Sequence, residues 1–288
     1  MRDRYHISIL VPGMPFNGYT LENASLGGSE TSGLLMAREL ARMGHWVRMF
    51  CNVDQPGDYE GVRYRHVNEF MKDLQTAPGD IAIVQRTPEP FLSKTVYRLH
   101  LVWCHDLAQA RNTGPYRSVC WNVDNFLTVS NWMAKQYKEA YGLPDDLVYA
   151  TRNGLDLPRF PRIDLSHKRR KRLIYAARPE RGLDVMLDSI FPKLIEADSE
   201  FELAIFGYAN MVEHLREFYA SLADKARQFG DKVRFVGTLA KGPQYRAYAE
   251  GGLYVYPTPS ARYKEFSEVS CISAMEAQAC GLPVVTSN

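Results

Sequence analysis

Short apolar runs alternate with longer segments of helical pattern along the chain, and this alternation constrains its fold more than any other feature. In the first half the predicted strands are Ile7–Val11, Trp46–Cys51, Ile81–Gln85, Leu99–Cys104 and Phe126–Val129. Parallel strands buried on both faces have such continuous apolar sequences, and the helices between them serve as crossover connections. The pattern therefore predicts an α/β fold of doubly wound parallel sheets, as in Rossmann-like domains.

A turn-rich segment and a basic run divide the chain into two such regions. Residues 153–162 are rich in turn formers, residues 166–172 are strongly basic, and the alternation restarts behind them. At 288 residues with 45% apolar content, two domains are expected, at 1–160 and 161–288. The elements predicted for the second domain are Leu173–Ala177, Gly182–Ala197, Phe201–Gly207, Met211–Phe229, Val233–Val236, Gly242–Glu250, Leu253–Tyr256, a helix through Ile272 to Ala279, and a last strand within Pro283–Asn288.

Small hydroxyl residues mark the predicted starts of three helices. Ser29 and Ser130 each precede a helical pattern that ends at a glycine, and Ser267 or Ser270 can cap the helix through Ile272. A serine oxygen at the N-cap accepts a hydrogen bond from a free backbone N–H of the first turn. We therefore expect side-chain caps at these positions.

The overall charge and the cysteine pattern exclude several classes of protein. The 35 basic and 33 acidic residues nearly balance, so no global field would gather nucleic acid. The five cysteines include no C-x-x-C pair, which indicates a reducing compartment and neither a disulfide framework nor a zinc site. The apolar run near the N-terminus is too short for a signal peptide. These features predict a cytoplasmic protein without a zinc site.

Two features leave alternatives open for partners. The basic run at 166–172 is either a solvated entry to the next strand or a peripheral contact with an anionic membrane or phosphate. The last predicted strand ends with the chain, so we expect an incomplete second domain with a bare sheet edge. A second copy in a dimer, or another partner, would cover that edge.

Two segments at predicted strand ends suit an anionic ligand. Gly27 and Gly28 follow the first strand, where small residues let backbone N–H groups approach a diphosphate at a helix N-terminus. The alternative is a plain tight turn. Arg178 and Arg181 follow the first strand of the second domain and could bind phosphate oxygens. The alternative is a surface arginine paired with Glu180.

Two carboxylates, Glu268 and Glu276, are separated by seven residues near the chain end. Glu268 is predicted in the loop before a helix and Glu276 within it, flanked by alanines. A carboxylate in such apolar surroundings is costly unless it lines a cleft or has a partner. In a cleft, both could accept hydrogen bonds from the hydroxyls of a sugar or ribose.

The joint order of these motifs resembles the retaining nucleotide-sugar glycosyltransferases of family 4, and the resemblance covers nearly the whole chain. The motifs are Gly27-Gly28-Ser-Glu, Val129-Ser-Asn-Trp-Met, Arg152-Asn-Gly-Leu-Asp156, Arg178-Pro-Glu-Arg-Gly-Leu-Asp184, Ile205-Phe-Gly207, Phe235-Val-Gly237, Tyr256-Pro-Thr and Glu268-x7-Glu276. The resemblance implies a GT-B fold, two Rossmann-like domains around a deep cleft. It also implies a nucleotide-diphosphate sugar held mainly by the second domain, with no cofactor and no catalytic metal.

The resemblance also implies roles for single residues. It places Glu268 against the donor sugar hydroxyls and Glu276 against the ribose, while Gly28 and Arg181 match positions that hold the diphosphate. The commoner family pattern has an arginine followed five positions later by a lysine. Here Arg181 takes the place of that lysine, and Arg178 is the candidate for the arginine.

A histidine at a first-domain strand end completes the expected site. Family members often place such a histidine near the donor sugar, so His105 is either a site residue or a structural residue at the strand end, and Asp106 would orient it. Asn153 resembles the motif near the hinge, with a turn as the alternative. In the family, retention is thought to proceed by front-face attack, with the leaving phosphate accepting the acceptor's proton.

The expected activity is therefore transfer of a hexose from a nucleotide-diphosphate donor to an acceptor hydroxyl, with retention of configuration. The acceptor would be a glycan, a lipid or a small molecule. Family members usually continue for several tens of residues more, so we expect a truncated domain and reduced turnover. The alternatives are a catalytically impaired nucleotide-sugar-binding fragment of this fold and a sugar-nucleotide epimerase, against which the Glu268 and Glu276 pattern argues.

Overall fold

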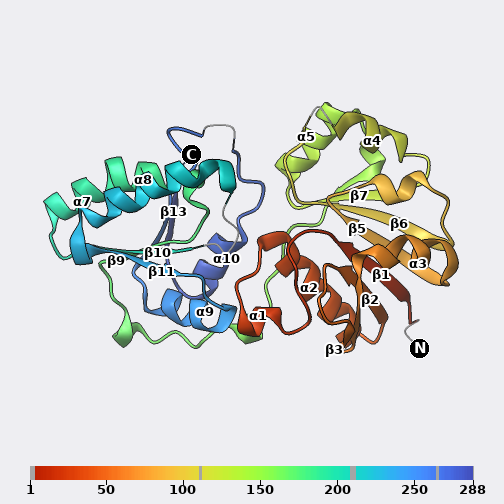
Figure 1. Ribbon diagram of the computed structural model, residues 1–288, viewed down its shortest axis with the longest axis horizontal. Coiled ribbons are helices and arrows are strands. Elements are labelled where there is room, and N and C mark those ends of the chain that lie inside the picture. Colours follow the sequence, from red (N-terminus) through yellow and green to blue (C-terminus); the bar gives the residue numbers. More distant parts are fainter. Residues whose placement is uncertain (1–3, 110–111, 208–211, 264–265, 288) are drawn as a thin grey trace. The chain divides into compact units, whose positions relative to one another are not determined.

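The computed structural model describes residues 4–109, 112–207, 212–263 and 266–287 (Figure 1). The chain divides into two compact units. Unit 1 comprises Met1–Leu21 and Leu26–Gly154, and unit 2 comprises Glu22–Ser25 and Leu155–Asn288. The division falls after Gly154, the short segment Glu22–Ser25 groups with unit 2, and the boundary at residue 160 stays a prediction.

Unit 1 contains an eight-stranded sheet in the order β3-β4-β2-β1-β5-β6-β7-β8. Its strands pair in parallel except β3 with β4. The five predicted strands are present near their expected positions in the interior of the sheet, whereas β3, β4 and β8 were not predicted. The strands are β1 His6–Val11, β2 Trp46–Cys51, β3 Gly57–Tyr59, β4 Val62–His66, β5 Gly79–Gln85, β6 Tyr97–Cys104, β7 Asn125–Thr128 and β8 Val148–Ala150.

The helices of unit 1 confirm one predicted cap and correct another. They are α2 Gly28–Arg42, α3 Phe70–Thr76, α4 Thr113–Ser118 and α5 Asn131–Tyr141, while α1 Thr20–Asn23 begins in unit 1 and ends in the segment assigned to unit 2. Ser130 caps α5 as expected, because its hydroxyl accepts a hydrogen bond from the Met133 N–H at 3.2 Å. The prediction of Ser29 as the cap of α2 is wrong. The cap position is Gly27 without a side-chain bond, and the Ser29 hydroxyl instead donates to Glu30 at 3.0 Å.

Unit 2 contains a parallel five-stranded sheet in the order β11-β10-β9-β12-β13. The strands are β9 Arg172–Tyr175, β10 Glu202–Phe206, β11 Val233–Gly237, β12 Leu253–Tyr256 and β13 Val284–Thr286. The longer helices are α7 Phe191–Ala197, α8 Arg216–Arg227, α9 Lys241–Glu250 and α10 Ile272–Ala279. Helices α7 and α8 cover one face of the sheet, and α9 and α10 cover the other (Figure 1). The predicted doubly wound parallel architecture is therefore present in both units.

The first long helix of unit 2 is interrupted where one continuous helix was predicted. A short helix, α6 Leu183–Val185, leads into a π-helical segment at Met186–Ile190, and α7 follows. Pro192 lies in the first turn of α7 and has no N–H to donate to the preceding turn. Wider π turns occur where the regular hydrogen-bond ladder is broken in this way.

Candidate functional site

In unit 2, Glu268 lies in the loop before α10 and has defined partners for both carboxylate oxygens. The Tyr256 hydroxyl donates to Oε2 at 2.9 Å, and the backbone N–H groups of Val269 and Ser270 donate to Oε1 at 3.1 and 3.2 Å. Burial, followed by the nearby negative charge of Glu268, raises the pKa of Tyr256, which therefore remains a donor at neutral pH. The Glu268 side chain keeps 24% exposure, so its position is fixed while part of it remains open to a ligand.

The N-cap of α10 differs from the one expected from the sequence. The structure places Cys271 at the N-cap without a side-chain bond, so the prediction of Ser267 or Ser270 is wrong. The carboxylate of Glu268 explains the difference, because it binds the backbone N–H groups just before the helix and orders the turn in place of a hydroxyl cap.

Arg181 lies beside Glu268. Its Nη1 is 4.0 Å from Glu268 Oε2, and its guanidinium carbon lies 4.1 Å from the centre of the Phe266 ring. Gly182 makes this approach possible, since its φ of +108° is in the left-handed region and a Cβ there would collide with the Pro257 carbonyl. The segments after β9 and β12 therefore bring one cation and one carboxylate together at the carboxyl ends of parallel strands, where ligands of such sheets bind.

Arg178 is engaged within the protein. Its Nη1 lies 3.6 Å from Glu180 Oε1, and the Tyr219 hydroxyl donates to Glu180 Oε2 at 2.8 Å. The structure thus contains the ion pair that the sequence offered as the alternative to a phosphate contact.

Glu276 lies in the core of unit 2, in an environment unlike that of Glu268. Lys241 Nζ donates to its two oxygens at 2.7 and 2.9 Å, and the Tyr245 hydroxyl donates to Oε1 at 2.9 Å. The Glu276 side chain is 1% exposed and that of Lys241 is 11% exposed. The expected cost of a carboxylate among alanines is thus offset by a buried ion pair rather than by exposure to a cleft.

Sequence reasoning did not identify Lys241, although the sequence contains a signal for it. The lysine opens α9, where the helix dipole disfavours a positive charge. The predicted helix began one residue later, at Gly242, so this signal becomes visible only with the observed start of α9.

In unit 1, the glycine loop before α2 surrounds a carboxylate of the protein itself. Glu30, in the first turn of α2, is 4% exposed. A Cβ atom added to Gly27 or to Gly13 would collide with its carboxylate oxygens. The glycines thus make room for Glu30, and an anion bound against Gly27 or Gly28 in this conformation would meet a negative charge.

His105 follows β6 and is largely shielded from solvent. Its Nε2 lies 3.2 Å from the Nε2 of Gln85, and its ring packs 4.7 Å from that of Trp103. Burial lowers the pKa of His105 to about 4, against a weaker opposing effect of Asp106. The imidazole is therefore neutral at pH 7 and can accept or donate one hydrogen bond without adding charge.

Asp106 binds Arg86, a residue that sequence reasoning missed. Arg86 Nε and Nη2 donate to the two Asp106 oxygens at 2.8 and 3.0 Å, and Arg86 Nη1 lies 3.5 Å from Glu30 Oε1. The hydrogen bond to Asp106 is the main cause that raises the pKa of Arg86. No pattern in the surrounding sequence marks Arg86, because its partners come from distant segments. Asn153 lies elsewhere in unit 1 and accepts from the Ser32 hydroxyl at 3.4 Å.

The basic run at the start of unit 2 is largely neutralised by nearby acidic groups. Lys168 donates to the Gly281 carbonyl at the end of α10, at 3.0 Å. Arg169 and Arg172 both pair with Glu202, and Lys171 pairs with Asp198 and Glu200. These contacts agree with the solvated entry to a strand rather than with a free cationic patch.

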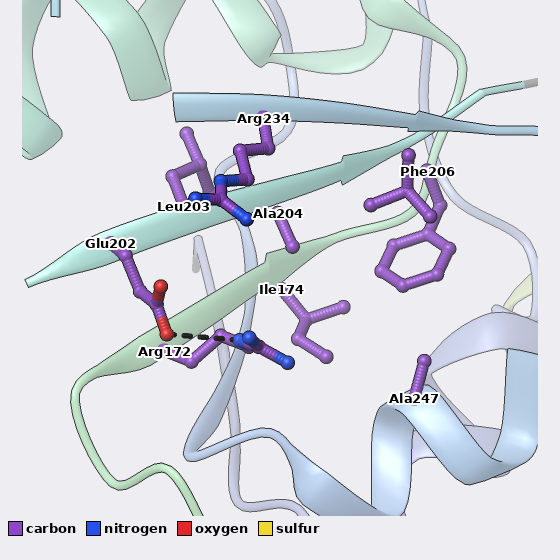
Figure 2. Close-up of a pocket in the computed structure, with 9 residues that line it drawn as sticks. Arg172, Ile174, Glu202, Leu203, Ala204, Phe206, Arg234 and Ala247 are labelled. Atoms are coloured by element: carbon purple, nitrogen blue, oxygen red, sulfur yellow. Dashed lines mark hydrogen bonds and ion pairs between the residues drawn. The ribbon is translucent and has the colours of Figure 1, made fainter. Parts of the chain in front are cut away.

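A cavity of about 190 Å³ lies on the α9 face of the second sheet (Figure 2). Ile174, Ala204 and Phe206 contribute apolar walls, and the Arg172–Glu202 ion pair lies at one side. None of the site residues predicted from sequence lines this cavity.

Among the described residues, no cluster of three or more His, Cys, Asp or Glu side chains is arranged to hold a metal ion. A scan of the same residues found no helix with the length and apolar content needed to cross a membrane.

Comparisons with known proteins agree with the fold. Residues 170–288 match the family model described as Glycosyl transferases group 1. Sucrose-phosphate synthase from Thermosynechococcus elongatus has 14% identity and a TM-score of 0.72 over 98% of this chain and 81% of its own. A glycosyltransferase from Rickettsia africae has 14% identity and a TM-score of 0.74 over 99% and 80%.

Anabaena HepE, solved in complex with UDP-glucose, has 15% identity and a TM-score of 0.73 over 98% of this chain and 80% of its own. A search of curated proteins found no match to the sequence. Residues 170–288 thus match the model of the glycosyl transferases group 1, and over nearly its whole length the chain has the GT-B fold of solved glycosyltransferases.

Proposed function

We propose that this chain transfers a hexose from a nucleotide-diphosphate sugar to an acceptor hydroxyl, with retention of anomeric configuration. The observation that carries the proposal is the cluster of Arg181, Glu268 and Tyr256 at the carboxyl ends of β9 and β12. A guanidinium suits a diphosphate and a fixed carboxylate suits sugar hydroxyls, so the cluster can hold both parts of such a donor.

The matches support the same class of donor. The solved structures of Anabaena HepE contain UDP-glucose, UDP with glucose, and UDP. By analogy we propose a uridine diphosphate sugar for this chain.

In the proposed reaction, Arg181 stabilises the charge that develops on the departing diphosphate. A fixed donor aimed at developing charge is effective because it needs no reorganisation during the reaction. Glu268 orients the sugar through its hydroxyls. Tyr256 and the two backbone N–H groups after Glu268 keep the carboxylate in place. We propose that the neutral His105 of unit 1 serves the donor sugar in the same reaction. We also propose that no metal takes part.

The test is calorimetric binding of UDP and UDP-glucose to the wild-type chain and to Arg181→Ala. Loss of a charged contact to phosphate should weaken binding by about 1.5–3 kcal/mol, or roughly tenfold to a hundredfold. Arg216→Ala is the matched control, because Arg216 forms an exposed ion pair with Glu213 in the same unit. Equal affinity of the Arg181 and Arg216 variants would refute the placement of the diphosphate.

Activity is tested by incubating the chain with a panel of nucleotide sugars and acceptors, with and without EDTA, and measuring released nucleoside diphosphate. Proton NMR of the product then reports the anomeric configuration. Binding without hydrolysis or transfer for any pair would favour a nucleotide-sugar-binding protein over an enzyme. Loss of turnover in EDTA would refute the metal-free mechanism.

A further inference from the structure

Arg86 joins three separate segments of unit 1 at the carboxyl ends of β5 and β6. It directly follows β5, while Asp106 lies two residues beyond β6 and Glu30 lies in the first turn of α2. We propose that Arg86 is a positioning residue that fixes the His105–Asp106 segment and anchors it to Glu30 in the glycine loop. The role in catalysis rests on the proposed function, in which His105 serves the donor sugar.

The backbone of Arg86 is held in a disfavoured conformation. Its φ is +69°, in the left-handed region that non-glycine residues rarely adopt. Two hydrogen bonds hold it there. The Arg86 N–H donates to the Trp103 carbonyl at 3.0 Å, and the Tyr116 hydroxyl donates to the Arg86 carbonyl at 3.2 Å. A disfavoured backbone that neighbours hold in place on both sides indicates a position where the direction of the side chain matters.

The side chain of Arg86 binds both neighbouring carboxylates. It forms a two-pronged contact with Asp106 and a longer contact with Glu30, and its own side chain is 34% exposed. Because one cation faces two anions, Arg86 is poorly suited to capture a further anion. Its geometry instead fixes Asp106, whose backbone carbonyl also accepts from the Tyr137 hydroxyl at 3.0 Å. The segment that carries His105 is thus held through both the side chain and the main chain of its neighbour.

The arrangement also controls the charge around His105. Asp106 and Arg86 are the charged groups that act on the imidazole, with opposite effects on its pKa. While the guanidinium neutralises Asp106, burial dominates and the ring stays neutral. Removal of the guanidinium would leave a free carboxylate beside the ring and favour its protonation.

The test combines nitrogen NMR titration of His105 with steady-state kinetics in Arg86→Gln and Arg86→Lys. Arg98→Gln is the matched control, since Arg98 is the second residue of β6 and has an 85% exposed side chain and a long 3.9 Å contact to Asp80. We expect Arg86→Gln to raise the pKa of His105 by roughly one pH unit. We also expect kcat to fall at least tenfold with a smaller change in KM, because misplaced groups slow the chemical step. Lysine keeps the charge but cannot form the two-pronged contact, so Arg86→Lys should lose turnover with less change in the titration.

A double variant separates positioning from general support of the fold. If Arg86 acts through Asp106, Arg86→Gln combined with Asp106→Asn should titrate and turn over like Asp106→Asn alone. Additive losses in the two variants, or an Arg86→Gln titration equal to that of Arg98→Gln, would overturn the proposal. The titration tests the positioning role of Arg86 even if the wild-type chain transfers no sugar. The absence of transfer would refute the proposed function and leave the structural role of Arg86 intact.

Discussion

The buried Lys241–Glu276 pair allows a quantitative test of what stabilises unit 2. Glu276 is almost fully buried, and Lys241 with Tyr245 satisfies its oxygens. The change Lys241→Met removes the cation but keeps a side chain of similar length, so a carboxylate stays in the core with one remaining donor. Breaking a buried pair in this way costs about 3–5 kcal/mol of the free energy of unfolding. Because Lys241 retains slight exposure, we expect about 3 kcal/mol.

The matched control is Lys225→Met in the same unit. Lys225 pairs with Asp188 at 2.6 Å, but the two side chains are 40% and 46% exposed. Exposed pairs contribute about 0–1 kcal/mol, so this variant should stay within about 1 kcal/mol of the wild type. The double variant Lys241→Met with Glu276→Gln removes both buried charges. It should recover at least about 1 kcal/mol relative to the sum of the single changes, because the unpaired charge is gone.

Urea unfolding with two probes assigns the loss to the correct unit. The tryptophans all lie in unit 1, so their fluorescence reports unit 1, whereas far-UV circular dichroism reports both units; they are Trp46, Trp103, Trp121 and Trp132. Lys241→Met should shift the dichroism transition that belongs to unit 2 and leave the fluorescence transition in place. A loss no larger than that of Lys225→Met would refute the argument that the pair is buried and essential.

Three further outcomes follow from the geometry. The folded pKa of His105, about 4, lies below its ordinary 6.5, so the unfolded chain binds more protons between these values. Stability from this group is complete above pH 6.5 and falls by about 3 kcal/mol as the pH drops to 4, and His105→Gln should remove that part of the pH dependence in urea melts. Gly182→Ala should cost more than about 2 kcal/mol, since a Cβ collides with a backbone carbonyl, whereas Gly230→Ala, with open space and φ of +55°, should cost about 1 kcal/mol in the same melts. Tyr256→Phe removes the donor to Glu268 and should weaken UDP-glucose binding by about 1 kcal/mol in calorimetry, and an unchanged affinity would argue that Glu268 needs no such support.

The interior strands could be predicted from the sequence because burial on both faces requires a continuous apolar run. Strand β2 at Trp46–Cys51 and strand β12 at Leu253–Tyr256 have the predicted ends. The missed strand β4 has the alternating burial of a strand covered on one side. Charged residues at alternate positions interrupt its apolar sequence, so it has no continuous apolar run. Strand β3 pairs antiparallel at the sheet edge and is short, so its pattern is weaker still.

At some helix caps, tertiary contacts override the local sequence preference. Ser130 caps its helix as its local sequence predicts, with its hydroxyl accepting from the Met133 N–H. At α2 the cap position falls to Gly27, and Ser29 donates to Glu30 within the turn. A serine at the N-cap stabilises a helix by about 1 kcal/mol. Hydrogen bonds from several donors to a buried carboxylate can contribute more than this.

The candidate site could be predicted in part, and the limit is physical. Arg181 and Glu268 lie in the segments that follow β9 and β12, and the alternation of strands and helices is enough to place the carboxyl ends of these strands on one side of the sheet. Arg86 and Lys241 are different, because each is defined by a carboxylate far away in the sequence. In the structure both positions conflict with local preference, through a left-handed backbone at Arg86 and a cation at the N-terminus of a helix at Lys241. The conflict at Arg86 has no counterpart in the sequence.

These two conflicts lead to one conclusion about the carboxylates that the sequence pattern singled out. A charge in an unfavourable local position is retained when a tertiary partner compensates for it, so the cation shows where an anionic partner lies. Lys241 marks Glu276, and Arg86 marks Glu30 and Asp106. Glu268 lies farther from its cation than Glu276 and Asp106 do from theirs. Its partners are a tyrosine, two backbone N–H groups and the more distant, partly exposed Arg181. Of the two carboxylates in the Glu268-x7-Glu276 pattern, the one held by weaker and more open partners is therefore better placed to exchange them for a ligand.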